Sequence, residues 1–212
     1  MSLVETSPIR LEVIPSGLRN PVMLIPGFVE PDFFLTPAAH VLRRQGMVAT
    51  TSKIGVNTGR VSHDIHLAEE HLLLFFEQCG GEAVTLVGHS LGGLYARILA
   101  LRHPDIVKGV VTVGSPSHHN PIESIRSFKL AGHVMMDLLG KLLHEYVDEL
   151  REPIDVPEHH VYTPFDLIVN HPDHCNEGPH VHHRVLATNH FTLMLNPFIL
   201  RALGNILPKN KI

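Results

Sequence analysis

Apolar residues gather in short continuous blocks along the chain, and longer segments with helically spaced apolar residues separate these blocks. The blocks predict strands at 21–28, 47–55, 83–88, 107–116, 160–169 and 181–187. The segments between them predict helices at 37–46, 63–81, 91–103, 122–150 and 191–206. Strands and helices therefore alternate along the chain.

The strand blocks consist mainly of Val, Leu and Ile with little polar alternation, which is typical of strands that are buried on both faces. We therefore predict an α/β fold with a mostly parallel, twisted sheet of about six strands and helices on both faces. A helical insertion precedes the penultimate strand. The 212 residues contain no repeat, linker or low-complexity segment, so we expect a single domain over 1–212.

One short motif carries candidate chemistry. The segment Gly88-His89-Ser90-Leu91-Gly92 matches G-x-S-x-G and joins a predicted strand to a predicted helix. In so sharp a turn the neighbouring backbone leaves no room for side chains two positions before and after the centre, so glycines fit there. The central hydroxyl would project beyond the carboxyl edge of the sheet, at a helix N-terminus that favours negative charge. The alternative is an ordinary glycine-rich turn.

Several further segments occur in a recognisable order, namely "LIPGF", "VGHSLGGLYARILA", "VVTVGSP", "PFDLIV" and "NHFTLMLNP". With them the chain resembles α/β-hydrolases of the lipase and esterase type, from about Pro21 to about Phe198. The resemblance implies the α/β-hydrolase fold and a triad in the order serine, acid, histidine. Only about twenty residues precede "VMLIPG", so the chain resembles a minimal member that lacks the first strands of larger ones.

Position has to select the catalytic base, because the chain has 18 histidines. In this fold the base follows the last strand, and His190 stands between the predicted last strand and the closing helix. His182 and His183 lie inside that strand, which would hold their rings away from the serine. His89 lies within the elbow and is expected to point elsewhere. The alternative for His190 is a polar residue at the start of a helix.

The acid should end the strand before the last one. The segment "HVYTPFD" stops at Asp166, and the resemblance places a triad aspartate in such a segment. Asp155 precedes the strand and would lie at the opposite edge of the sheet. Asp173 lies further into the following loop. We favour Asp166, whose carboxylate would hold the histidine tautomer and stabilise the imidazolium.

Two backbone N–H groups are needed to stabilise an oxyanion. The resemblance assigns one to Leu91, which follows the nucleophile, and the other to Phe28 in the loop after the first main strand. That loop begins Pro26-Gly27-Phe28, a short form that points to lipase-like enzymes. Pro26 stands where a histidine is more usual, which removes a side chain that would brace the loop.

Two segments have open interpretations. Residues 117–152 are either a helix packed on the sheet or a cap over the serine, with Met135 and Met136 as adaptable lining of an acyl pocket. The histidine-rich stretch at 171–183 is either a solvated loop or a metal site. Its candidate zinc ligands are His171, His174, Cys175 and His180. Their spacing fits no familiar zinc pattern, and we expect no metal.

Composition narrows the function. Hydrophobic residues make up 44% of the chain, and a net charge of −4 comes without long runs of one sign, so no nucleic-acid partner is expected. No apolar stretch reaches the length of a membrane span, although a transient lipid-surface contact is compatible with the sequence. The N-terminus lacks a secretion signal, so we expect a soluble, cytoplasmic protein.

The expected function is therefore an esterase or lipase that needs no cofactor and acts on an uncharged, fairly hydrophobic ester. An acyltransferase or thioesterase with the same triad is the first alternative. A non-catalytic metal-binding or interaction protein on this scaffold is the second.

Overall fold

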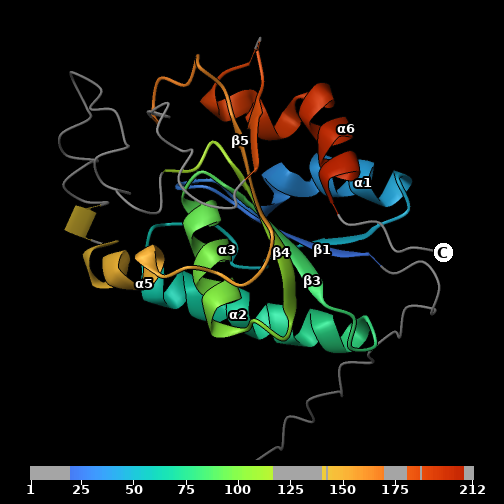
Figure 1. Ribbon diagram of the computed structural model, residues 1–212, viewed down its shortest axis with the longest axis vertical. Coiled ribbons are helices and arrows are strands. Elements are labelled where there is room, and N and C mark those ends of the chain that lie inside the picture. The colour runs from blue at the N-terminus through green and yellow to red at the C-terminus, as the bar shows by residue number, and fades with distance from the viewer. Residues whose placement is uncertain (1–19, 117–139, 142, 170–180, 187, 208–212) are drawn as a thin grey trace, which may run out of the picture.

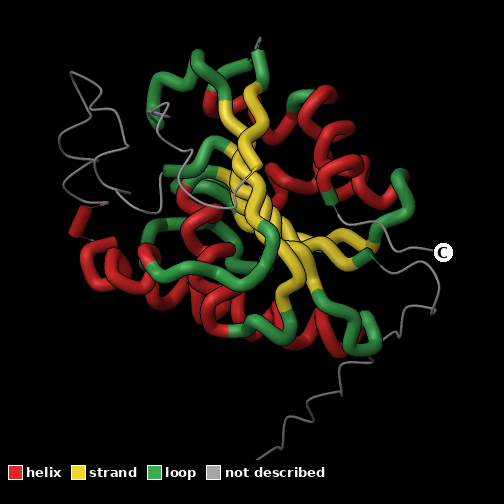
Figure 2. Tube along the Cα trace, viewed as in Figure 1, coloured by secondary structure: helices red, strands yellow, loops and turns green. Residues whose placement is uncertain are grey.

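The computed structural model describes residues 20–116, 140–141, 143–169, 181–186 and 188–207. Within these residues six strands form one sheet in the order β2-β1-β3-β4-β5-β6, and each neighbouring pair is parallel. The strands are β1 (Pro21–Ile25), β2 (Val48–Thr51), β3 (Val84–His89), β4 (Val107–Val113), β5 (Glu158–Tyr162) and β6 (Val181–Arg184). The sheet twists through the centre of the molecule (Figure 2). The predicted α/β architecture is confirmed.

Helices cover both faces of the sheet (Figure 1). On one face lie α1 (Thr36–Arg44) and α6 (Pro197–Ile206). On the other lie α2 (Val61–Gln78), α3 (Leu91–Arg102) and the short α5 (Val147–Arg151). Three short 3-10 helices complete the described elements, namely η1 (Asp32–Leu35), η2 (His144–Tyr146) and η3 (His190–Leu195). None of the helices in these ranges is long and apolar enough to cross a membrane.

The continuous apolar strands are explained by two hydrophobic cores, one on each face of the sheet. All five residues of β1 are buried. Met23 and Ile25 belong to the core beneath α2 and α3, whereas Val22 and Leu24 belong to the core beneath α1 and α6. Since side chains alternate across a strand, a strand covered on both faces needs apolar residues at every position.

A buried ion pair connects β5 to α3. The Arg97 guanidinium on α3 pairs with the Glu158 carboxylate on β5, and both side chains are almost completely buried. The Nε of Arg97 also donates to the carbonyl of Leu150, 2.9 Å away. The arginine therefore links α3, α5 and β5.

Most predicted strands are longer than the observed ones, and two of the differences along the chain are explained by a proline. The strand expected at 160–169 ends at Tyr162, because Pro164 has no N–H for a ladder and restricts the residue before it. The closing helix expected at 191–206 is divided into η3 and α6 at Asn196, which is extended and precedes Pro197.

The predicted helical segment at 122–150 lies mostly outside the described residues. Its described part contains η2 and the start of α5. The cap hypothesis for 117–152 therefore remains a prediction.

Candidate active site

Ser90 sits between β3 and α3 in a strained backbone conformation, with φ 49° and ψ −122°. A residue other than glycine rarely adopts a positive φ, so the surrounding structure must hold Ser90 there. A Cβ on Gly88 would lie 2.2 Å from the carbonyl oxygen of Gly92, and a Cβ on Gly92 would lie 2.4 Å from that of Ile25. These distances are too short for any side chain, so the two glycines are required by backbone packing.

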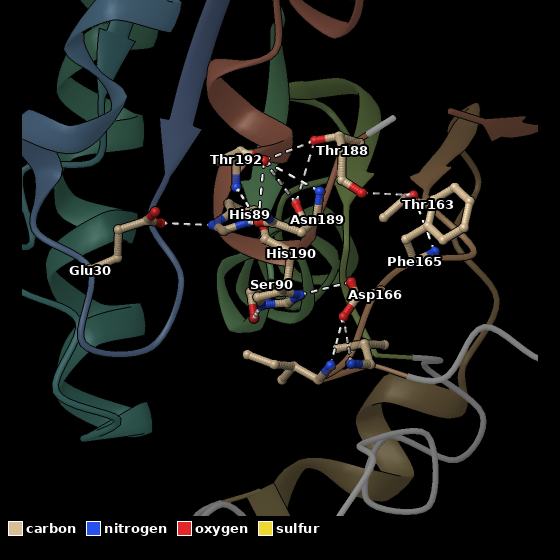
Figure 3. A network of polar contacts seen from close by, with 12 residues as sticks. Glu30, His89, Ser90, Thr163, Phe165, Asp166, Thr188, Asn189, His190 and Thr192 are labelled. Carbon is tan, nitrogen blue, oxygen red and sulfur yellow. Dashed lines mark hydrogen bonds and ion pairs between the residues drawn. The ribbon is translucent and has the colours of Figure 1, made fainter. Parts of the chain in front are cut away.

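The structure brings Ser90, His190 and Asp166 together (Figure 3). The Nε2 atom of His190 lies 3.0 Å from the Oγ of Ser90, and its Nδ1 lies 2.8 Å from the Oδ2 of Asp166. His190 and Asp166 are buried, while Ser90 is half-buried. A carboxylate only accepts hydrogen bonds, so the Nδ1 of His190 carries the proton and Nε2 is free to accept one from the serine.

The Asp166 carboxylate is held from its other side. Its Oδ1 accepts the backbone N–H groups of Ile168 and Val169, at 2.9 and 2.8 Å. Those two donors direct Oδ2 at the imidazole of His190. Asp166 lies four residues beyond the end of β5 rather than within the strand, so the loop and not the strand aims this side chain.

His190 is the first residue of η3. A capping box of Asn189 and Thr192 fixes the start of this helix. The loop before it is tied to the Asp166 loop, because the Thr163 hydroxyl donates to the carbonyl of Thr188 at 3.2 Å. The base and the acid are therefore carried by two loops that are bonded to each other.

The loop after β1 packs directly on the serine. A Cβ on Gly27 would lie only 2.9 Å from the Cβ of Ser90. The N–H of Gly27 donates to the Oε2 of Glu30 at 2.6 Å. The N–H groups of Phe28 and Leu91 have no hydrogen-bond partner among the described residues. The expected role of these two N–H groups as oxyanion donors remains a prediction.

Glu30, Asn57 and His89 also take part in the site, and the sequence did not reveal their roles. The Nδ2 of Asn57 donates to the carbonyl of Pro26 at 2.8 Å. The Glu30 carboxylate accepts the N–H of Gly27 in the same loop. These two hydrogen bonds support the loop, although Pro26 stands where a histidine was expected to do so. Among the described residues no hydrogen bond joins His89 to the Ser90 side chain, but the Nε2 of His89 donates to the carbonyl of His190 at 3.0 Å. Glu30 is 59 residues from His89 in the chain, so no local motif joins them.

The other candidate positions are only partly described. Met135, Met136 and most of the stretch at 171–183 lie outside the described residues. Within the described residues, no group of three or more His, Cys, Asp or Glu side chains could hold a metal ion. The metal hypothesis for this stretch therefore remains untested.

His182 and His183 lie within β6, as predicted. The His183 Nε2 lies 3.1 Å from the Nδ1 of His159 on β5. Burial lowers the pKa of both His159 and His183 below the usual value of 6.5. His183 lowers the pKa of His159 further, and His182 lowers the pKa of His183 further.

A parallel sheet with a serine elbow at its carboxyl edge, followed in chain order by an acid and a histidine, is the architecture of the α/β-hydrolases. Residues 32–141 match the family model described as alpha/beta hydrolase fold. This match spans more than half of the chain, so the protein belongs to the α/β-hydrolase family.

Solved structures with the same fold are distant in sequence. One is a structure described with LipS and LipT, two metagenome-derived lipolytic enzymes. It has 14% identity and a TM-score of 0.64, and the match covers 88% of this chain and 92% of that one. Est1E from Butyrivibrio proteoclasticus has 14% identity, a TM-score of 0.62 and coverage of 89% and 87%. Epoxide hydrolase A from Mycobacterium thermoresistibile has 15% identity, a TM-score of 0.60 and coverage of 88% and 91%. At such identities the likeness shows the fold alone.

Proposed function

We propose that the protein is a serine hydrolase that cleaves carboxylic esters through an acyl-enzyme on Ser90. The observation that carries this proposal is the position of His190, whose two ring nitrogens bridge the Ser90 hydroxyl and the Asp166 carboxylate. A serine hydroxyl is a weak nucleophile at neutral pH and needs such a base, itself oriented by a third group.

The reaction would proceed in two halves. In the first, the Nε2 of His190 takes the hydroxyl proton as the Oγ of Ser90 attacks the ester carbonyl carbon. The tetrahedral oxyanion receives hydrogen bonds from the N–H groups of Phe28 and Leu91, and the alkoxide leaves with the proton from His190. In the second, His190 takes a proton from water, the hydroxide attacks the acyl carbon, and Ser90 regains its proton as the acid departs.

The surroundings of the three residues support an uncharged, hydrophobic substrate. Large apolar side chains with exposed surface flank the acid, follow the base and lie in the loop after β1. They are Val29, Phe165, Leu167 and Phe191. Exposed apolar side chains next to catalytic residues favour apolar ligands over ionic ones. Lipolytic enzymes and an esterase domain from a Rhodothermus marinus protein, which share this fold, agree with that substrate class.

The first experiment is intact-mass labelling with a fluorophosphonate, which reports an activated serine without knowledge of the substrate. Wild-type protein should gain one adduct, and Ser90→Ala should gain none. Ser62→Ala is the matched control, because Ser62 is exposed on α2 and should label like wild type. Absence of an adduct on folded wild-type protein would overturn the proposal.

A second series addresses the substrate. Neutral nitrophenyl esters of increasing acyl length are compared with esters that carry a terminal carboxylate on the acyl chain. We expect turnover of the neutral esters and little turnover of the charged ones. A preference for the charged esters would contradict the assignment of a hydrophobic substrate.

An acyltransferase or thioesterase is the second candidate function, since a thioesterase domain from the curacin biosynthetic pathway shares the fold with a TM-score of 0.58. The triad would be the same, and only the leaving group or the second acceptor would differ. Adding an alcohol or a thiol to the ester assay separates the two. Capture of the acyl group faster than by water would favour transfer over hydrolysis.

A further inference from the structure

Two polar side chains with little exposed surface connect the two halves of the site. Glu30 belongs to the loop after β1, and His89 is the residue immediately before the serine (Figure 3). The Nδ1 of His89 lies 2.9 Å from the Oε2 of Glu30, and the exposed fractions of the two side chains are 4% and 11%. No step of the proposed reaction uses either group directly.

The contacts of this pair extend in both directions. The same Oε2 of Glu30 accepts the N–H of Gly27, whose backbone touches Ser90. On the other side, the Nε2 of His89 donates to the carbonyl of His190, 3.0 Å away. The rings of His89 and His190 are also neighbours, with centroids 5.3 Å apart. One chain of hydrogen bonds therefore runs from the oxyanion loop to the backbone of the base.

Both partners of the His89 ring are groups that ordinarily accept hydrogen bonds. A carbonyl oxygen only accepts hydrogen bonds, so Nε2 must carry a hydrogen. The Oε2 of Glu30 already accepts the N–H of Gly27, and a carboxylate oxygen also accepts from Nδ1. Both ring nitrogens thus face acceptor groups, an arrangement that a doubly protonated imidazole would satisfy. Hydrogen bonds between ionised partners are shorter and stronger than neutral ones.

We propose that Glu30 and His89 are positioning residues, a carboxylate–imidazolium pair that holds Gly27 and the carbonyl of His190 in register with Ser90. This inference rests on the proposed function, since turnover requires Ser90 to be active. The pair keeps the oxyanion loop and the base at fixed positions while charge develops between them. Small displacements of reacting groups are costly, and a shift of about 1 Å can lower a rate by about 100-fold.

Three substitutions separate the contacts of the pair. In His89→Asn the amide nitrogen takes the place of Nδ1 and keeps the Glu30 contact, but the donor to His190 is lost. In His89→Gln the amide nitrogen reaches the place of Nε2 and restores that donor. Glu30→Gln removes the negative charge. One atom of its amide group must replace Oε2, which contacts both the N–H of Gly27 and the Nδ1 of His89.

The chain offers a matched control for the loss of such a pair. Glu69 on α2 lies 2.6 Å from the Nε2 of His103, which follows α3. His103 and Ser90 flank opposite ends of α3, about 18 Å apart for a helix of this length. Glu69→Gln removes a carboxylate from a histidine without touching the site and should leave kcat and KM unchanged.

The kinetic expectation concerns kcat rather than KM, because the pair does not touch substrate. His89→Asn and Glu30→Gln should lower kcat by about 10-fold to 100-fold, with KM close to wild type. His89→Gln should recover most of the loss that His89→Asn causes. The positioning role is overturned if His89→Asn and Glu30→Gln keep kcat within about twofold of the Glu69→Gln control.

The charge state has its own measurement, which does not depend on turnover. Proton–nitrogen NMR of protein labelled at histidine should show both ring nitrogens of His89 protonated near pH 7.5, with His89→Gln assigning the signals. The same spectrum is expected from Ser90→Ala. A single protonated nitrogen would overturn the charged pair, even where a variant fails to fold. If fluorophosphonate does not label wild type but this spectrum appears, the proposed function fails while the charged pair stands.

Discussion

Replacement of Asp166 by asparagine is the sharpest test of the site, because the structure dictates how the new side chain must sit. The Oδ1 of Asp166 accepts two backbone N–H groups, those of Ile168 and Val169. In Asp166→Asn the amide oxygen must keep that place, since an NH₂ group there would face two donors. The NH₂ group is then left in the place of Oδ2, 2.8 Å from the Nδ1 of His190.

That orientation forces the wrong tautomer on the base. An NH₂ group donates, so the Nδ1 of His190 must accept and the proton moves to Nε2. An Nε2 that carries a proton cannot take one from Ser90, 3.0 Å away. In a serine triad this change lowers kcat by about 10⁴-fold, which corresponds to about 5.5 kcal/mol of transition-state stabilisation.

The assay is the rate of fluorophosphonate labelling together with turnover of a neutral nitrophenyl ester. The thermal midpoint of Asp166→Asn should stay close to that of wild type, because the two backbone hydrogen bonds are retained. Asp155→Asn is the matched control, since Asp155 is exposed before β5 and should leave both rates unchanged. Wild-type turnover in Asp166→Asn would refute the tautomer argument and move the acid role to another residue.

Three further substitutions test the packing around the site. Gly88→Ala places a Cβ 2.2 Å from backbone in α3 and should abolish soluble folded protein, whereas Gly109→Ala meets nothing nearer than 3.4 Å and should keep its thermal midpoint within about 3 °C; folded Gly88→Ala would contradict this. Arg97→Leu removes the arginine partner of the buried Glu158 carboxylate and should lower the free energy of unfolding by about 3–5 kcal/mol in urea denaturation, and a loss below about 1 kcal/mol would argue against a buried pair. Burial lowers the pKa of His183 below 6.5, so the contribution of this neutral histidine to stability is fully present above about pH 6.5 and is lost as the pH falls through the lowered pKa. His183→Gln should therefore reduce the loss in free energy of unfolding between about pH 7 and about pH 5. An equal loss in wild type and variant would exclude this linkage.

The sequence predicts best those features that depend on neighbouring residues. Continuous apolar blocks identify strands covered on both faces, and β1 and β3 are buried along their whole length. The glycines around Ser90 are readable for the same reason, because the backbone of one tight turn requires them. His190 could be selected among 18 histidines because the family order places the base after the last strand.

Features that depend on distant partners could not be predicted. The position of Asp166 was expected at a strand end, but β5 stops at Tyr162 and backbone donors in the following loop aim the carboxylate. Glu30 and His89 acquire their roles only when the loop after β1 folds against the elbow. Neither residue has a local signature, since one is an ordinary loop glutamate and the other occupies a variable position of the motif.

The separation of Ser90 from His190 along the chain has a consequence for when the site forms during folding. The two residues that share a hydrogen bond are 100 positions apart, and the base arrives after β6. A nascent chain that has already built β1, β3 and α3 holds a serine elbow without a base. Because closing so long a loop is slow and requires the rest of the sheet, hydrolytic competence would appear only at the last stage of folding. During synthesis the unfinished chain would therefore hold the serine without the histidine that activates it in the proposed reaction.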